Sequence, residues 1–417
     1  MSENEWKFDT KVIHACQSPK DWHGATLPPI YQTAAHRFDT AEELSEVFAG
    51  KEPGFIYQRL RNPTNQVIEQ KIAELERGVG AVATSSGMAA VANSVLAIAD
   101  SGDEIVSGNS LFMSTYILFA NVLPRFGIKA KLVESIDLAQ YERAITEKTK
   151  LIFVETIGNP KMDVPDIAEL AKIAHRHSVP LIVDNTLPTP YLFRPVEHGA
   201  DIVVHSLTKF FNGHGSAIGG VIVDSGEFPW PLDKYESFKL SKERRPNAPF
   251  LDKVWREIHI NFGTTLAPMH AFLTLIGLDT LVLRMERHVV NALKLAGYLS
   301  NHEKVKWVNY PGLASSPSHE TAKRQFSGLG FGGLLTFGLE SQEACFSLIK
   351  NLKLVYHLAN LGDSKTLAIH PYSSQYVAFT AEARQMLSIS PEMIRVSVGI
   401  EHIDDIIADF EQALAKV

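Results

Sequence analysis

Short apolar segments alternate with helical patterns between about residues 80 and 225, and this alternation restricts the possible folds more than any other feature of the chain. Five segments have the length and the Val/Ile content of buried strands, at 103–108, 150–156, 180–186, 201–207 and 218–224. Between the second and the third, apolar residues recur at helical spacing from Ile167 to Ala174. Strands separated by helices indicate βαβ units and a largely parallel central sheet. Ligands of such sheets bind at the carboxyl ends of the strands.

The pattern changes after about residue 265. A long or broken helix is predicted over 268–302, with strands within 304–311, 332–340 and 394–401 and an amphipathic helix over 403–417. These elements predict a smaller α+β domain. The first residues are rich in turns and predict an extended arm. We therefore expect an N-terminal arm over 1–65, a ligand-binding domain over 66–265 and a C-terminal domain over 266–417.

Charge and composition exclude several classes of partner. The chain has 40 basic and 47 acidic residues, a net charge of −7, whereas binders of nucleic acid or anionic membranes need a basic excess or a basic stripe. No apolar run reaches the roughly 18 residues of a membrane span, and the first residues lack the apolar core of a signal peptide. The two cysteines, Cys16 and Cys345, form neither a disulfide framework nor a CxxC motif. We expect a cytoplasmic protein with no nucleic-acid and no membrane partner.

Lys209 follows the predicted strand 201–207 in the stretch HSLTK, where a charged side chain is unexpected. Burial or a cofactor can lower the pKa of such a lysine until its amine is a nucleophile. The alternative is a surface lysine on a loop. Ser206 and Thr208 place hydroxyls suited to an anion beside it, and glycines follow at 213, 215, 219 and 220, which let the backbone approach a ligand.

Asp184 closes the preceding predicted strand, in LIVDNT. An aspartate there is most often a turn former or a helix cap. However, an aspartate and a lysine at the ends of neighbouring parallel strands are the arrangement that pyridoxal phosphate requires. The lysine binds the aldehyde, and the aspartate keeps the pyridine nitrogen protonated so that the ring accepts electrons.

Other segments offer groups for the phosphate and for a substrate. Ser85, Ser86 and Gly87 precede a predicted helix, whose N-terminus attracts anions, although serine there is often only a cap. Tyr57 and Arg59 lie two residues apart and could contact the same phosphate; the alternative is a solvated arm. Arg395, in the alternating strand IRVSVGIE, could hold the carboxylate of an amino acid in a bidentate pair. Its alternative is an edge-strand arginine paired with a surface acid.

Two rival motifs occur in the wrong context, and a third is absent from the sequence. SLTK satisfies S-x-x-K, but it follows a strand and lacks the accompanying S-D-N and K-T-G motifs. GLGFGG at 328–333 satisfies G-x-G-x-x-G, but it precedes a predicted strand instead of opening a helix. No H-E-x-x-H occurs and the histidines are scattered, so we expect no catalytic metal. A non-catalytic binding protein on the same fold remains open.

Taken together, VDNT, HSLTK, SSGMAAV, YQRLRNPT and IRVSVGIE resemble the pyridoxal-phosphate enzymes of cysteine and methionine metabolism, the trans-sulfuration family. The resemblance implies an α/β, fold-type I, aspartate-aminotransferase-like architecture. The implied architecture has a mostly parallel central sheet in the cofactor-binding domain and a smaller α+β C-terminal domain, and the implied assembly is a homotetramer built as a dimer of dimers. It also implies a set of cofactor-binding residues, namely Tyr57, Arg59, Ser86, Gly87, Met88, Phe112, Asn159, Asp184, Ser206, Thr208 and Lys209. Tyr57 and Arg59 are expected to reach the cofactor of the neighbouring subunit.

Within this family, ANLGDSKTLAIHP at 359–371 looks most like the O-acetylhomoserine sulfhydrylases, because cystathionine synthases and lyases more often carry Ser for Asn360 and Glu for Lys365. Ser114 stands where methionine γ-lyases have a reactive cysteine. The resemblance implies a γ-replacement that makes homocysteine from O-acetylhomoserine and sulfide or another sulfur donor. Methionine γ-lyase and cystathionine γ-synthase are the alternatives.

For that reaction, the resemblance implies catalytic roles for Lys209 and Asp184, with Arg395 and Asn360 binding the substrate. Two departures stand out. Phe112 replaces the tyrosine usually stacked on the cofactor, so the acid–base role of the missing hydroxyl is lost or moves, with Tyr57 as the candidate. HPYSSQY, from residue 370, replaces the small residues usual after His-Pro. Because of both changes, the identity of the leaving group, acetyl or succinyl, and the identity of the sulfur donor are open.

Overall fold

Two β-sheets organise the computed structural model, which describes residues 5–17 and 20–417. The larger sheet has seven strands in the order β1-β7-β6-β5-β4-β2-β3. In chain order these are β1 (Gly80–Thr84), β2 (Glu104–Gly108), β3 (Lys129–Val133), β4 (Thr149–Glu155), β5 (Leu181–Asp184), β6 (Ile202–Ser206) and β7 (Gly220–Asp224). The strands β6, β5, β4, β2 and β3 are neighbours in this order and run parallel to one another. Strand β7 runs antiparallel to both β6 and β1. The mostly parallel central sheet is confirmed.

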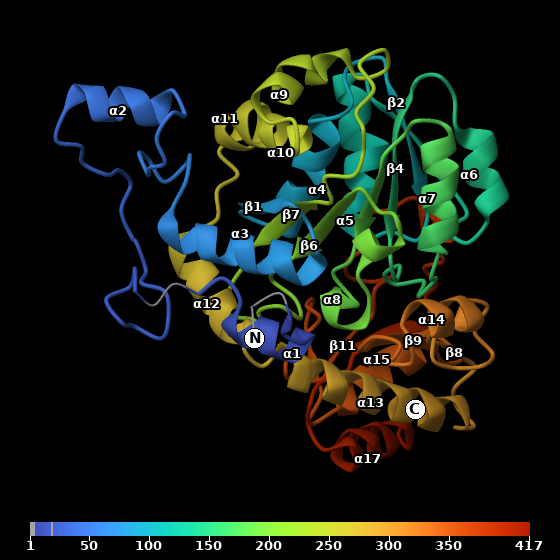
Figure 1. The fold of residues 1–417 in the computed structure, drawn as a ribbon. Coiled ribbons are helices and arrows are strands. Elements are labelled where there is room, and N and C mark those ends of the chain that lie inside the picture. The colour runs from blue at the N-terminus through green and yellow to red at the C-terminus, as the bar shows by residue number, and fades with distance from the viewer. Residues whose placement is uncertain (1–4, 18–19) are drawn as a thin grey trace.

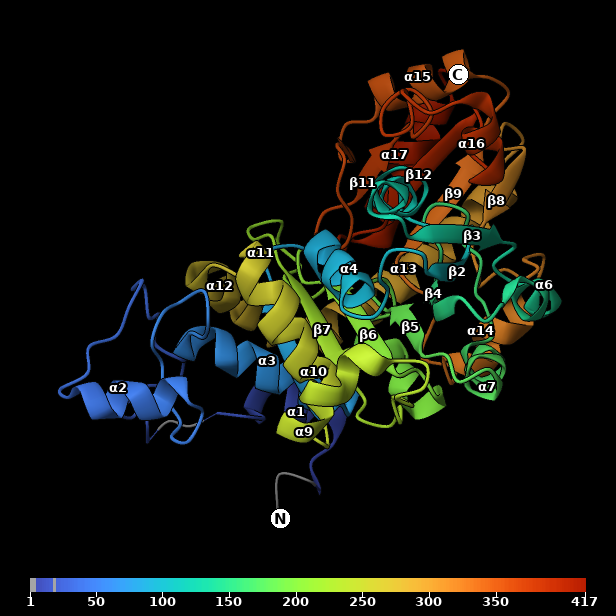
Figure 2. The ribbon, with the colours of Figure 1, turned by 90° about the horizontal axis from the view of Figure 1, so that it is seen from above.

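Helices cover both faces of this sheet (Figure 1, Figure 2). On one face the packing helices are α3 (Pro63–Glu76), α7 (Ile167–Arg176), α12 (Pro268–Leu278) and α13 (Leu281–Ser300). On the other face they are chiefly α4 (Gly87–Leu96) and α10 (Pro249–Lys253). Alternate residues of the central strands, such as Ile182 and Val183, are therefore buried on opposite sides. This explains the continuous apolar runs in the sequence, which are typical of strands in parallel sheets.

The smaller sheet has five strands in the order β10-β11-β12-β9-β8. They are β8 (Trp307–Asn309), β9 (Leu334–Gly338), β10 (Tyr356–His357), β11 (Leu367–Ile369) and β12 (Met393–Ser397). One face packs on α13, α15 (Gln342–Asn351) and α17 (Ile403–Leu414) in a shared core. The smaller α+β C-terminal domain is thus confirmed, and the predicted long helix is broken into α12 and α13.

The N-terminal segment contains α1 (Phe8–His14) and α2 (Ala41–Phe48), so it is more helical than the expected extended arm. In Figures 1 and 2, α2 stands away from the body of the molecule. The predicted division at residues 65 and 265 remains a prediction. Residues 1–4, 18 and 19 of the predicted arm lie outside the described residues.

Shorter elements connect this framework. The remaining α-helices are α5 (Met113–Ile117), α6 (Leu138–Ala144), α8 (Thr189–Leu192), α9 (Lys239–Arg244), α11 (Ile260–Phe262), α14 (His319–Gln325) and α16 (Ala381–Met386). The π-helical segments are η2 (Leu118–Val122) and η6 (Val254–His259), and the 3₁₀ segments are η3 (Leu123–Phe126), η4 (Pro195–His198) and η5 (Glu236–Phe238). Asp137, Asp166 and Thr380 cap helices α6, α7 and α16 through their side chains.

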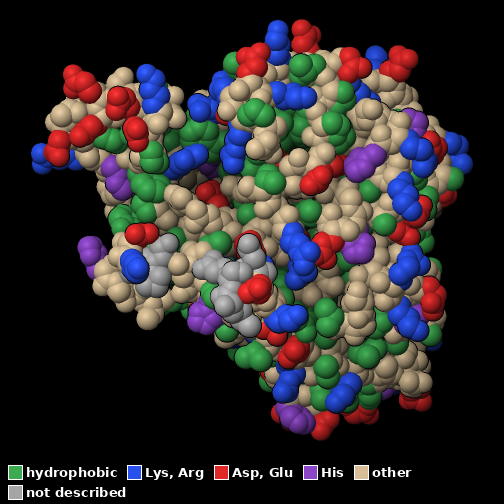
Figure 3. Space-filling view, in the orientation of Figure 1, with side chains coloured by type: hydrophobic (Ala, Val, Ile, Leu, Met, Phe, Trp, Pro, Cys, Tyr) green, Lys and Arg blue, Asp and Glu red, His purple; other side chains and the backbone are tan. Residues whose placement is uncertain are grey.

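Charged side chains of both signs are intermixed over the face shown in Figure 3. Within the described part of the chain, no helix combines the length and the apolar character needed to cross a bilayer. Over the same residues, no group of three or more His, Cys, Asp or Glu side chains is placed to hold a metal ion.

Candidate active site

Lys209 lies just beyond the carboxyl end of β6, and its side chain is largely buried. Its Nζ donates a hydrogen bond to Asn360 Oδ1 at 2.7 Å. Burial, together with a smaller effect of the positive charge on Arg395, lowers the pKa of Lys209 to about 8. A lysine with this pKa is partly neutral near physiological pH, so its amine can act as a nucleophile or a base.

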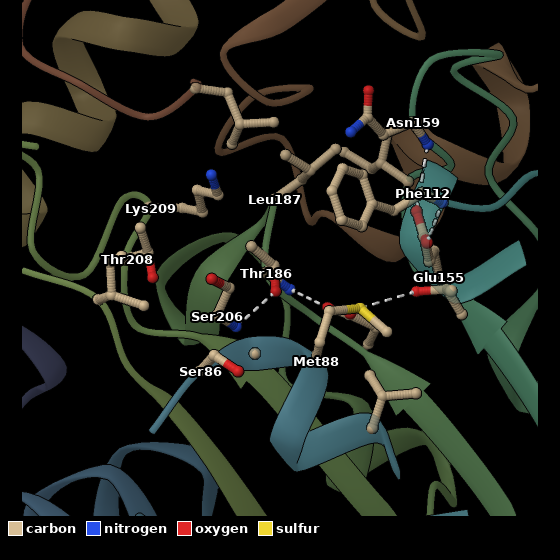
Figure 4. Close-up of a pocket in the computed structure, with 17 residues that line it drawn as sticks. Ser86, Met88, Phe112, Glu155, Asn159, Thr186, Leu187, Ser206, Thr208 and Lys209 are labelled. Carbon is tan, nitrogen blue, oxygen red and sulfur yellow. Dashed lines mark hydrogen bonds between the residues drawn. The ribbon is translucent and has the colours of Figure 1, made fainter. Parts of the chain in front are cut away.

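Lys209 projects into a cavity of about 290 Å³ at the carboxyl ends of the central strands. Figure 4 shows Lys209 and Thr208 on one side, Phe112, Glu155 and Asn159 on the other, and Thr186 and Ser206 between them. The wall includes most of the residues expected from the sequence, namely Ser86, Gly87, Met88, Phe112, Asn159, Asp184, Ser206, Thr208 and Lys209. One chain therefore brings nine of the predicted residues to one space, although their individual roles remain predictions.

Asp184 reaches this cavity because β5 and β6 run parallel, with Asp184 paired to Val204. Its Oδ1 accepts a hydrogen bond from the Thr186 N–H at 3.0 Å. Burial raises the pKa of Asp184, while the hydrogen bonds from Thr186 and the charge of His205 oppose that rise. The carboxylate is thus placed where a positively charged ring nitrogen would stabilise its ionised form.

Glu155 is a buried cavity residue that the sequence reasoning missed. It ends β4 and pairs in register with Asp184. Its Oε1 accepts from the Phe112 N–H at 2.5 Å and its Oε2 from the Asn159 N–H at 3.2 Å. Burial and the negative charge of Asp184 raise the pKa of Glu155 well above its usual range, which favours the protonated form of this carboxyl group. The available signal was its position, at the end of a predicted strand next to that of Asp184.

The N-terminus of α4 forms one end of the cavity. Ser86 caps this helix, with its Oγ accepting from the Ala89 N–H at 3.1 Å. A Cβ on Gly87 would lie 2.7 Å from Ser206 Cβ, and one on Gly220 would lie 2.2 Å from the Ser86 carbonyl oxygen. Only glycine therefore allows the helix end to lie directly against the end of β6. The free N–H groups and the dipole of this helix end favour an anion.

Thr186 is the second residue that the sequence reasoning missed. It lines the cavity, and its Oγ1 accepts a hydrogen bond from the Ser206 N–H at 2.8 Å. This contact joins the loop after Asp184 to the end of β6. The signal was weak, since a threonine after Asp-Asn reads equally well as part of a turn.

Arg395 lies on β12, at the centre of the smaller sheet, and its side chain is only 3% exposed. Its Nη1 donates to Asn159 Oδ1 at 3.2 Å and its Nη2 to the Asn360 carbonyl oxygen at 3.1 Å. Burial lowers its pKa to about 10. Among the described residues, its Nε has no hydrogen-bond partner and no carboxylate pairs with it. The alternative of an edge-strand arginine paired with a surface acid is therefore wrong.

Tyr57 and Arg59 do not line the Lys209 cavity of their own chain. They lie in a second cavity beside α2, and the Tyr57 side chain is 44% exposed. Arg59 Nη1 donates to the Ile260 carbonyl oxygen at 2.5 Å, and its guanidinium lies 5.7 Å from the centre of the Tyr57 ring. A contact between these two residues and the cofactor thus requires a second chain and remains a prediction.

The residues of the Lys209 cavity fit pyridoxal phosphate. The α4 N-terminus with the hydroxyls of Ser206 and Thr208 suits a phosphate, and the approach permitted by Gly87 forms the cradle. A lysine amine and a buried aspartate face the same space, as the aldehyde and the ring nitrogen require. Arg395 does not line this cavity, but its Nε has no hydrogen-bond partner among the described residues and so leaves a donor for the carboxylate of an amino acid.

Comparison with known proteins agrees with this geometry. The family model for Cys/Met metabolism PLP-dependent enzymes matches residues 9–415. Homocysteine synthase of Schizosaccharomyces pombe is 44% identical over 98% of this chain and 98% of its own length. O-acetyl-L-homoserine sulfhydrylase of Leptospira meyeri is 40% identical over 99% of this chain and 97% of its own.

A solved structure shares the whole fold. The crystal structure described as an O-acetylhomoserine (thiol)-lyase of Campylobacter jejuni superimposes with a TM-score of 0.95 at 35% identity, covering 98% of this chain and 100% of that one. That protein contains N′-pyridoxyl-lysine-5′-monophosphate. Its likeness confirms the expected fold-type I architecture. With the family model matching almost the full length, the chain belongs to the Cys/Met metabolism PLP-dependent enzymes.

Proposed function

We propose that this protein is an O-acetylhomoserine sulfhydrylase, a pyridoxal-phosphate-dependent γ-replacement enzyme. It converts O-acetyl-L-homoserine and sulfide to homocysteine and acetate in methionine biosynthesis. Relatives named homocysteine synthase and O-acetyl-L-homoserine sulfhydrylase, at 44% and 40% identity over nearly the full length, support this activity. Ser114, where a methionine γ-lyase would carry its reactive cysteine, supports replacement over elimination.

The observation that carries the proposal is the contact chain from Lys209 through Asn360 to Arg395. Asn360 accepts from Lys209 Nζ at 2.7 Å through its side chain, and from Arg395 Nη2 at 3.1 Å through its backbone carbonyl. One residue of the C-terminal region thus links a base to a carboxylate-binding group. An α-amino acid held by Arg395 would present its α-carbon near Lys209.

When bound, pyridoxal phosphate supplies an electron sink for carbanions of the amino-acid substrate. Lys209 takes the proton from the α-carbon and returns protons at later stages, which its pKa of about 8 permits. Asp184 would keep the pyridine nitrogen of the bound cofactor protonated. Glu155, with its raised pKa, holds a proton of its own and so limits the repulsion between the two carboxyl groups.

A replacement enzyme must keep water away until the thiol or sulfide arrives. The cavity wall carries several apolar side chains, namely Val91, Phe112, Ile157, Leu187, Ile218 and Leu361. Arg395 holds the substrate carboxylate and Asn360 orients Lys209. Because Phe112 lacks a hydroxyl, we assign proton transfer near the leaving group to Tyr57 of a neighbouring subunit.

The same proposal includes the assembly and its location. We infer a cytoplasmic homotetramer, a dimer of dimers, in which the arm over 1–65 reaches a second chain. Support comes from the place of Tyr57 and Arg59, away from their own Lys209 cavity. The cofactor-binding domain is assigned to 66–265 and the C-terminal domain to 266–417.

Product analysis tests the proposal. O-acetylhomoserine is supplied with and without sulfide, O-succinylhomoserine replaces it in a second series, cysteine replaces sulfide in a third, and methionine is supplied alone. We expect homocysteine to dominate when O-acetylhomoserine and sulfide are both present, with slow turnover of methionine. Rapid formation of 2-oxobutyrate and methanethiol from methionine would instead identify a γ-lyase, and cystathionine from cysteine a γ-synthase. If none of these substrate combinations is turned over, the alternative of a non-catalytic binding protein is favoured.

A further inference from the structure

A buried polar network lies on the face of the large sheet that α3 covers, opposite the cavity. Glu76, the last residue of α3, accepts a hydrogen bond through its Oε1 from Asn185 Nδ2 at 3.0 Å, and the same oxygen lies 2.6 Å from His205 Nε2. All three residues are 0% exposed. One carboxylate oxygen thus binds two residues that follow it in the chain by 109 and 129 positions.

Thr156 extends this network to a third strand. It follows β4, and its Oγ1 donates to Asn185 Oδ1 at 2.9 Å. The backbone joins the same segments, because the Thr156 N–H donates to the Asp184 carbonyl oxygen at 3.0 Å. The side chains of Glu76, Thr156, Asn185 and His205 therefore form one set of hydrogen bonds across the ends of β4, β5 and β6, here called the Glu76 network.

Each of these strand ends carries one cavity residue and one network residue, which are neighbours in the chain. The pairs are Glu155 with Thr156, Asp184 with Asn185, and Ser206 with His205. The first member of each pair lines the Lys209 cavity, and the second is not part of its wall. Consecutive residues of a strand point to opposite faces of the sheet. A shift of a network side chain therefore moves the backbone that carries its cavity neighbour.

The end of β6 has little room for such a shift. A Cβ on Gly87 would lie 2.7 Å from Ser206 Cβ, so the N-terminus of α4 is in direct contact with this strand end. On the other face, Phe211 contacts the His205 ring edge-on, with 4.9 Å between the ring centres. The place of Ser206 at the anion-binding helix end thus depends on how Glu76 and its neighbours hold His205.

Stability alone does not explain a carboxylate at position 76. Among the described residues, Glu76 Oε2 and His205 Nδ1 have no hydrogen-bond partner. The free-energy cost of burying a carboxylate can exceed what its hydrogen bonds return, and apolar side chains of the same size are often at least as stable. A buried polar group that is retained under these conditions calls for another role.

We propose that Glu76 is a positioning residue for the cofactor. Pyridoxal phosphate is one small, stiff molecule, and its ring nitrogen and its phosphate are expected to contact different strand ends, those of Asp184 and Ser206. Both contacts form together only if the strand ends keep one separation. Glu76 fixes that separation through Asn185 and His205, and it touches neither the cofactor nor the substrate.

The test uses Glu76→Gln, which keeps the side-chain size and an acceptor oxygen but loses the charge that strengthens both hydrogen bonds. The purified holoenzyme is dialysed against graded concentrations of pyridoxal phosphate, and the visible circular-dichroism band of the bound cofactor is recorded. We expect the dissociation constant of the cofactor to rise roughly ten-fold, because hydrogen bonds to a charged group are weakened but not removed. The band should weaken as well. With O-acetylhomoserine and sulfide, kcat should fall more than KM rises, because Arg395 lies on the other sheet.

Asp201 offers a matched control at the far end of the same strands. It directly precedes β6, is 2% exposed, and its Oδ2 accepts from the Leu181 N–H at 2.7 Å and lies 2.9 Å from His175 Nε2. Like Glu76, it is a buried carboxylate that binds β5 and a histidine, but it does not line the cavity. Asp201→Asn should lower the melting temperature and leave the cofactor affinity, the band and kcat close to those of the wild type.

Thr156→Val tests the other end of the network with a milder change. Valine keeps the shape of threonine and removes the hydroxyl that donates to Asn185 Oδ1. The dissociation constant of the cofactor should rise by about three-fold, since a neutral hydrogen bond contributes less than a charged one. This variant also decides the question if Glu76→Gln does not yield folded protein.

Wild-type cofactor affinity and a wild-type band in folded Glu76→Gln would overturn the proposal, as would equal changes in Asp201→Asn. If Glu76→Gln does not fold, wild-type values in Thr156→Val would overturn it. Only the kinetic measurement rests on the proposed sulfhydrylase function. Dialysis and dichroism need no substrate, so they still test the positioning role if the enzyme proves to act on another substrate.

Discussion

The cavity around Lys209 and the arm segment with Tyr57 and Arg59 are expected to serve one cofactor, yet a single chain determines them to different degrees. Lys209 is largely buried and its Nζ is bound by Asn360, a residue 151 positions away. Tyr57 is 44% exposed, and Arg59 is held mainly by the Ile260 carbonyl oxygen. The first group lines one cavity of a single chain, whereas Tyr57 and Arg59 lie outside that cavity.

This difference has a physical cause. The Lys209 cavity is formed where strand ends converge, and backbone pairing between β4, β5 and β6 fixes the positions of Glu155, Asp184 and Ser206. Among the described residues of the arm, Tyr57 has no strand pairing apart from one isolated bridge to Ala35. An exposed side chain on such a segment gains order from contact with another surface. The predictions below ask whether the two regions act together and in which chain.

The largest effect is expected at Lys209. Lys209→Ala removes the amine proposed to bind the cofactor aldehyde and to move protons, so kcat should fall by about 10⁴, the upper range for lost proton transfer. After borohydride reduction, the wild type should retain the cofactor covalently and the variant should not. Reduction that labels a different lysine in both proteins would show that Lys209 is not the attachment site.

Asp184→Asn is expected to have the next largest effect. The variant loses the charge proposed to keep the pyridine nitrogen protonated, but it keeps the side-chain size and the groups proposed for the phosphate. We expect kcat to fall by about 10² or more, roughly 2.7 kcal/mol, with the cofactor content nearly unchanged. Absorbance of the bound cofactor and single-turnover rates measure the two quantities. A near-normal rate would remove Asp184 from the mechanism.

Arg395→Lys should act mainly on substrate binding. A lysine is a point charge and cannot reproduce the two-pronged geometry of a guanidinium. KM should rise about ten- to a hundred-fold, the range for a lost hydrogen bond to a charged group. Steady-state kinetics with O-acetylhomoserine measures this change in KM. Analogues of O-acetylhomoserine that lack the α-carboxylate provide the control. Equal KM values for the variant and the wild type would mean that the carboxylate is held elsewhere.

The pKa of Lys209 gives a pH dependence with a defined sign. Below pH 8 the buried amine is protonated and inert, and above it the neutral form accumulates. In cofactor-free protein, acylation of Lys209 should therefore reach half its maximum near pH 8, whereas an unperturbed lysine with a pKa of about 10.4 needs a higher pH. Peptide mapping after labelling at several pH values measures it. If the labelling of Lys209 shows the same pH dependence as that of a lysine in a short peptide, the lowered pKa is contradicted.

Much of this cavity could be predicted because its signals are local. The segments at 150–156, 180–186 and 201–207 are apolar runs of strand length; β5 and β6 lie within the last two, and β4 lies within the first except that it starts one residue earlier. Once these strands were placed in parallel, Asp184 and Lys209 had to meet at one edge of the sheet. The glycines at 87 and 220 are explained only by the structure, where added side chains would collide with Ser206 and Ser86.

Other elements could not be predicted because their signals are short or depend on distant partners. β1 reads GAVAT, with little bulk, and β3 reads KAKLV at the sheet edge, so neither matches the apolar pattern of a central strand. β10 has two residues and exists through its pairing with β11. Glu155 accepts a hydrogen bond from the backbone N–H of Phe112, a residue 43 positions away, and no sequence pattern indicates such a contact.

The smallest expected effect tests the comparison between the two regions directly. Arg59→Ala should weaken the binding of the cofactor, because the phosphate would lose the guanidinium that is proposed to contact it. If Arg59 serves the cofactor of a neighbouring subunit, an Arg59→Ala chain and a Lys209→Ala chain can complement each other. In a mixed dimer, one site combines both substitutions, and the other has an intact Lys209 and an intact arm. Random reassembly of equal amounts should therefore restore activity at about a quarter of all sites.

The matched control pairs two substitutions within the Lys209 cavity. Lys209 and Asp184 line the same cavity of one chain, so Lys209→Ala and Asp184→Asn chains leave every mixed site with one defect. Reassembly of that pair should restore nothing. The activity of each mixture is measured after reversible dissociation, with each variant alone carried through the same steps. Recovery in the control pair, or none in the arm pair, would show that the division between own-chain cavity and partner-chain arm is wrong.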